Sequence, residues 1–81
     1  MKMIATFYSH FGATRFMKKC KDCGYQAKLM PVPRSLSSSC GTCVEYISKN
    51  EYPFNDYSEE IEQVVKVLPE GYELYYKAEN S

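Results

Sequence analysis

The spacing of apolar residues changes along this chain, and that change limits the folds it can adopt. Residues 2–8 alternate as a β-strand does, with Met3, Ala5 and Phe7 on one face. The next segment carries apolar residues at positions i, i+3, i+4 and i+7, as an amphipathic helix does: Ala13, Phe16, Met17 and Cys20. Ser9 can cap the start of this helix and Gly24 can end it. We therefore expect a strand followed by one helix between Ser9 and Gly24.

The rest of the chain repeats the same two patterns. Residues 25–32 and 42–47 read as strands, and residues 71–78 alternate as a final strand. A second helix is expected from near Asp56 to Leu68, because Ile61, Val64, Val65 and Leu68 again follow the helical spacing. The resulting order, β-α-β-β-α-β, predicts an α+β, ferredoxin-like sandwich with a four-stranded antiparallel sheet and two helices on one face. We expect residues 1–78 to form a single domain and residues 79–81 a polar tail.

Composition excludes several classes of partner. The chain has 81 residues, with 10 basic and 10 acidic side chains. This balance gives no electrostatic drive toward nucleic acid, and we expect no nucleic-acid partner. No apolar run approaches the roughly 18 residues that span a bilayer, and the N-terminus lacks the apolar length of a signal peptide. We expect a cytoplasmic protein with no membrane partner.

Four cysteines form two Cys-x-x-Cys pairs, Cys20 with Cys23 and Cys40 with Cys43. Sixteen residues separate the pairs, a spacing within the range of zinc sites. The expected fold places Cys23 and Cys40 at opposite ends of a strand, about 20 Å apart, too far for one zinc ion. We therefore expect no metal or other cofactor, with structural zinc binding through both pairs as an alternative function.

Cys40 has the setting of a reactive thiol. Ser37, Ser38 and Ser39 precede it and Gly41 follows it, so hydroxyls and loop amides can donate hydrogen bonds to an anion. Arg34 lies in the same loop, and His10 is expected to project from the neighbouring loop. Both would favour the thiolate form of Cys40. The alternative interpretation is a solvated polar loop with no chemistry.

This loop carries a family resemblance. The segments Phe7–His10 and Met30–Gly41, the latter with the run Val-Pro-Arg-Ser-Leu-Ser-Ser-Ser-Cys-Gly, resemble the putative Se/S carrier-like family of small bacterial domains. The resemblance covers about residues 3–77 and is specific mainly from Met30 to Gly41. It implies that Cys40 carries sulfur or selenium, surrounded by Pro33, Arg34, the three serines and Gly41. Cys43 and the Cys20/Cys23 pair depart from the family pattern.

The sequence thus favours a carrier that holds the chalcogen on Cys40 as a persulfide-type adduct, rather than a turnover enzyme. Cys43 would release the chalcogen by forming a disulfide with Cys40, if the loop bends back far enough. Such a carrier needs a donor and an acceptor protein. A different alternative is a non-catalytic interaction module. The sheet face without helices would present an apolar patch that can form a homodimer: Ile4, Tyr8, Met30 and Tyr75.

Overall fold

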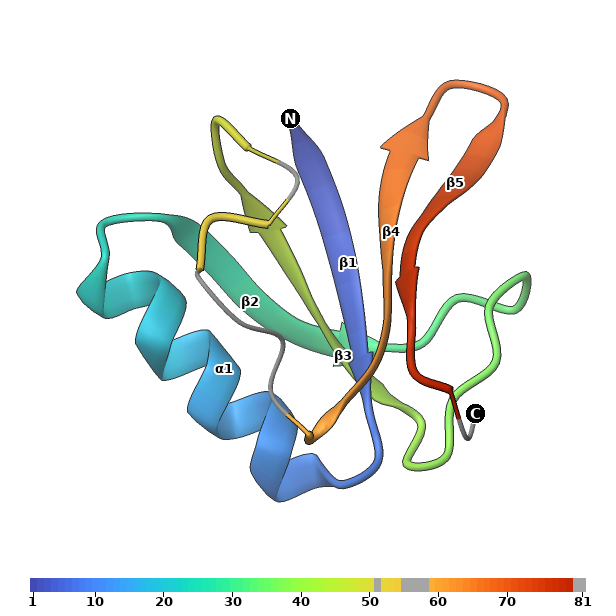
Figure 1. The fold of residues 1–81 in the computed structure, drawn as a ribbon, viewed down its shortest axis with the longest axis horizontal. Helices are drawn as coiled ribbons and strands as arrows, with labels where there is room; N and C mark the ends of the chain where they lie inside the picture. The colour runs from blue at the N-terminus through green and yellow to red at the C-terminus, as the bar shows by residue number, and fades with distance from the viewer. Residues whose placement is uncertain (51, 55–58, 80–81) are drawn as a thin grey trace.

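The computed structural model describes residues 1–50, 52–54 and 59–79. These described residues form one helix and five strands (Figure 1). In chain order these are β1 (Lys2–Phe7), α1 (His10–Asp22), β2 (Gln26–Pro31), β3 (Thr42–Ile47), β4 (Ile61–Leu68) and β5 (Gly71–Lys77). Ser9 caps α1 as expected, since its hydroxyl accepts a hydrogen bond from the Gly12 N–H. Within the described part of the chain, no helix is long and apolar enough to cross a membrane.

The five strands form one sheet in the order β2-β3-β1-β4-β5, and all neighbouring pairs are antiparallel. The helix α1 packs on one face, against β1, β2 and β3, while β4 and β5 extend the sheet beyond it (Figure 1). Neighbouring strands run in opposite directions. At one end of the sheet, β1 and β2 therefore finish where β3 and β4 begin. The loop from β2 to β3 therefore lies beside the β1–α1 turn.

The predicted ferredoxin-like fold, with four strands and two helices, is wrong. Residues 61–68, expected as the second helix, form β4. In the pairing with β1, Phe7 lies opposite Ile61 but Thr6 opposite Gln63, so Glu62 is an extra residue in β4. This bulge places Ile61 and Val64 on the same face, which reproduces a helical i, i+3 spacing. The expected start near Asp56 lies outside the described residues.

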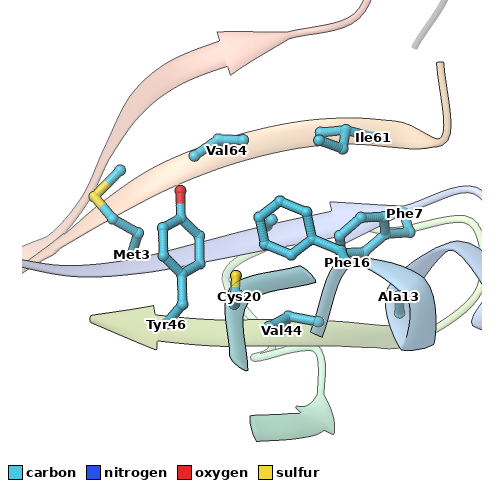
Figure 2. Close-up of a cluster of buried hydrophobic side chains, with 10 residues drawn as sticks. Met3, Phe7, Ala13, Phe16, Cys20, Val44, Tyr46, Ile61 and Val64 are labelled. Carbon is cyan, nitrogen blue, oxygen red and sulfur yellow. The ribbon is translucent and has the colours of Figure 1, made fainter. Parts of the chain in front are cut away.

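Both faces of the sheet contribute to burial, which explains the rest of the misleading pattern. On the helix side, Phe16 of α1 lies 5.3 Å from the rings of both Phe7 and Tyr46, measured between centroids. Figure 2 shows this main core, which also holds Met3, Ala5, Ala13, Cys20, Val44, Ile61 and Val64. The neighbouring Val65 is buried on the other face. A strand buried on both sides has no simple alternation of apolar and polar residues.

The face without the helix is partly covered by the chain itself. Ile4, Cys43 and Val65 form a second buried cluster there, and Met30, Val32, Leu36 and Val67 pack against it. Val32 and Leu36 come from the loop that follows β2, so this loop folds back over the sheet. Of the four residues expected to form an open patch, Ile4 is only 2% exposed. The expected homodimer through this face stays a prediction.

Candidate functional site

The loop of residues 32–41 is closed at its base and carries Cys40 near its end. The Val32 N–H donates a 3.1 Å hydrogen bond to the carbonyl of Gly41, which joins the two ends of the loop. A turn follows Pro33, where the Leu36 N–H donates to the Pro33 carbonyl. Gly41 has φ +75°, a backbone conformation that side-chain-bearing residues rarely adopt. Gly41 thus lets the chain turn directly into β3 after Cys40.

The serine run fastens the loop to the neighbouring strands. The Ser38 hydroxyl donates to the carbonyl of Phe7 at the end of β1, at 3.3 Å. The side-chain amide of Gln63 in β4 donates to the carbonyl of Ser37, at 2.9 Å. The hydroxyls expected to bind an anion are therefore used, at least at Ser38, to hold the loop in place. Ser37 itself is exposed.

Glu62 is the partner of the third serine. Its carboxylate accepts hydrogen bonds from the Ser39 N–H at 3.2 Å and from the Ser39 hydroxyl at 2.7 Å. The Thr6 hydroxyl donates to the same carboxylate at 3.3 Å. Sequence reasoning missed Glu62, because it was assigned to a helix. The bulge that turns its side chain toward the loop leaves no recognisable signal in the sequence.

Cys40 and His10 lie at the same end of the sheet, as expected from the chain directions. Cys40 is half-buried and packs against the main core, and its thiol donates to the Thr42 carbonyl at 3.4 Å. The exposed His10 places Nδ1 3.4 Å from the Thr42 hydroxyl. Both side chains thus contact the same residue, at the first position of β3. Arg34 is exposed in the turn of the loop and is in no ion pair with the described residues.

Cys43 and Cys40 contact buried clusters on opposite faces of the sheet. Its side chain is fully buried in the cluster on the face opposite α1, and its thiol donates to the Pro31 carbonyl at 3.7 Å. Burial, with smaller effects from Glu45 and Cys40, raises the pKa of the Cys43 thiol to about 11. Cys40 packs on the helix side instead. The expected disulfide would need the backbone around Gly41 to move.

The other cysteine pair, Cys20 and Cys23, lies away from this end of the sheet. Cys20 is fully buried under α1, and burial, followed by the nearby Cys23, raises the pKa of its thiol to about 12. Cys23 is exposed at the C-terminal cap of the helix. Among the residues that the structure describes, no three His, Cys, Asp or Glu side chains are grouped to hold a metal ion. The zinc alternative gains no support from these placements.

Comparison with known proteins gives one match. The family model described as "Putative Se/S carrier protein-like" matches residues 2–73, from the first residue of β1 into β5. No curated protein and no solved structure matches the chain. The match includes the whole loop of residues 32–41, Glu62 and all four cysteines.

Proposed function

Because the chain belongs to the Se/S carrier protein-like family, we propose that it carries sulfur or selenium on Cys40. The observation that supports this best is the position of Cys40 in the described structure. It is a half-buried thiol on a loop fastened to β1 and β4, whereas Cys20 and Cys43 are fully buried. A fixed, partly accessible cysteine can meet a donor protein and still shield its cargo from solvent.

The loading step needs no cofactor. The Cys40 thiolate attacks the outer sulfur of a persulfide on the donor, forming a new S–S bond and breaking the donor's S–S bond. The donor leaves as a thiolate and takes up the proton released by Cys40, so there is no net oxidation. Attack by an acceptor thiolate on the outer atom then returns Cys40 to its starting state. With selenium, the transferred outer atom is selenium instead of sulfur, and the step again involves no net oxidation.

The surrounding residues take two roles in this proposal. His10 lies at the loop end through its contact with Thr42, where an imidazole N–H can donate a hydrogen bond to the adduct anion. Arg34 is exposed on the same loop and is available for the same purpose or for the donor. Ser38 and Ser39 position the loop rather than bind the cargo, because their hydroxyls donate to Phe7 and Glu62.

The proposed carrier uses a single thiol. Cys43 lies on the opposite face of the sheet with a raised pKa, so the disulfide between Cys40 and Cys43 is not part of this proposal. Release therefore depends on an acceptor protein that supplies its own thiol. A reducing, cytoplasmic setting suits this chemistry, since Cys40 must be a free thiol to accept the next atom.

The test is intact-mass spectrometry after incubation with glutathione persulfide and, separately, with selenodiglutathione. We expect one added sulfur atom in the first case. In the second we expect one added Se–glutathione group, with one glutathione released. Exposed Cys23 is itself accessible to these reagents, so the test uses the Cys23→Ser variant, which retains both adducts. Adding Cys40→Ser to this variant abolishes them. Loading that survives in the double variant, or that is lost in Cys23→Ser alone, contradicts the proposal.

A further inference from the structure

A groove lies on the sheet face opposite α1, over β4 and β5. It is an open groove of about 550 Å³ that runs along β5, with Leu36 of the folded-back loop on one side. Its apolar lining is poorly covered, because Leu74 is 57% exposed and Tyr72 is 37% exposed. Large apolar side chains gathered on one exposed surface are typical of interaction sites.

The strand register places the lining residues on one face. Leu74 lies opposite Val65 of β4, and Tyr72 lies opposite Val67, so all four share this face. Oppositely charged residues mark the two ends of the groove. Glu70 lies in the turn between β4 and β5, and Lys77 lies at the last position of β5.

We propose that this groove is the interface of a homodimer, with a second copy of the chain as its occupant. A two-fold axis that crosses β5 at its middle sets the two β5 strands antiparallel and face to face. The midpoint between residues 70 and 77 falls beside Leu74, so the two Leu74 side chains meet near the axis. Glu70 then lies next to Lys77 of the partner subunit, and the same pair recurs by symmetry.

The dimensions and the total charge fit this arrangement. Seven residue steps lead from Glu70 to Lys77, at most about 23 Å at roughly 3.3 Å per step, so the charged pairs flank an apolar centre. An apolar centre with a charged rim is the common pattern of specific interfaces. The net charge of the chain is zero, so two copies do not repel each other.

Pairing through the sheet edges is less favourable than this face-to-face contact. At one edge, β2 carries Pro31, which lacks an N–H donor, and Lys28, which is paired with Glu45. At the other edge, β5 is interrupted by a bulge, because Val64 lies opposite Tyr76 and Val65 opposite Leu74. A bulge at an edge opposes continuous pairing with another strand. The exposed face of β5 is therefore the better contact.

Sedimentation velocity over a range of protein concentrations tests the proposal. We expect a reversible dimer for the unmodified chain. The single substitutions Glu70→Lys and Lys77→Glu each place like charges at both ends of the interface. Each weakens dimerisation by roughly tenfold in Kd, since two attractive pairs become repulsive. The double substitution restores both pairs with reversed sign and returns Kd to near its original value.

Two further variants complete the experiment. Leu74→Asp removes the contact at the axis and yields a monomer. Glu73→Lys, on the same strand but pairing with Lys66 on the other face, leaves Kd unchanged. All these side chains are exposed, so circular dichroism should show an unchanged fold. A chain that stays monomeric at high concentration, or a double variant that dimerises no better than the single ones, overturns the proposal. Its outcome is independent of whether Cys40 carries a chalcogen.

Discussion

Alkylation of Cys43 should be much slower in the folded protein than in the unfolded chain. The protein is treated with iodoacetamide at about pH 8, once in the folded state and once unfolded in urea. The reaction measures the thiolate, because the thiolate is the form that reacts. The folded structure raises the thiol pKa from 9.0 to about 11. At that pH the thiolate fraction of Cys43 is therefore roughly 100-fold lower in the folded state.

Two further effects set the expected rate. A thiolate of higher pKa is intrinsically more nucleophilic, which recovers roughly tenfold. The side chain is also fully buried, so the reagent cannot reach it without local opening. We expect folded Cys43 to react at least tenfold more slowly than unfolded Cys43, and most labelling to follow transient opening.

Timed quenching, digestion and peptide mass spectrometry measure this rate at each cysteine separately. Cys23 is the internal control, because it is exposed at the end of α1 and should label readily in both states. Folded Cys43 that reacts within about threefold of its unfolded rate would refute the link between burial and protection. The result bears directly on the single-thiol carrier, since a protected Cys43 cannot resolve an adduct on Cys40.

Three other measurements follow from the same structure. Burial raises the thiol pKa of Cys20 to about 12 and that of Cys43 to about 11, from 9.0 in the unfolded chain. The stability that depends on these two neutral thiols is therefore fully present below pH 9 and decreases as the pH rises above 9. Between about pH 8 and about pH 10, urea denaturation should show the unmodified chain losing about 2–3 kcal/mol more than the variant with alanine at both positions; equal losses would contradict the assignment. Glu62→Gln should cost about 1 kcal/mol and speed hydrogen exchange at the Ser39 amide, as followed by NMR, and unchanged exchange would count against the carboxylate as the anchor. Gly41→Ala should cost about 1 kcal/mol in thermal denaturation from backbone strain alone, because no atom lies within 4 Å of the added methyl group, and a neutral effect would argue against the positive φ.

The first half of the fold follows from local signals in the sequence. The expected strands at 2–8, 25–32 and 42–47 correspond to β1, β2 and β3, and the expected helix corresponds to α1. Each of these segments has its own regular spacing of apolar residues, and residues that favour turns or caps mark its end. Ser9 caps the helix as expected, and Gly24 follows it with φ +85°. These are short-range effects that need no knowledge of the rest of the chain.

The expected final strand at 71–78 corresponds to β5, but the segment before it fails because its pattern reflects tertiary structure. In β4, the bulge at Glu62 and the burial of Val64 and Val65 on opposite faces together imitate a helical stripe. The β-branched residues of this segment were the signal against a helix. The error carries into the site. Cys40 and His10 could be placed at one edge from the chain directions alone, but the anchor of Ser39 could not, because it comes from the misassigned segment.

The bond between Ser39 and Glu62 joins residues 23 positions apart in the chain. During synthesis on the ribosome, Cys40 is therefore made well before the carboxylate that holds its loop. Until β4 docks, β1 is an unpaired strand edge, and the loop of residues 32–41 lacks its attachment to Glu62 and Gln63. A nascent or truncated chain that ends before β4 would present Cys40 on a loop that keeps its bonds from Ser38 to Phe7 and from Val32 to Gly41 but lacks those to β4. The reactivity of the Cys40 thiol therefore reports when the sheet is complete, and pulsed alkylation during refolding measures it.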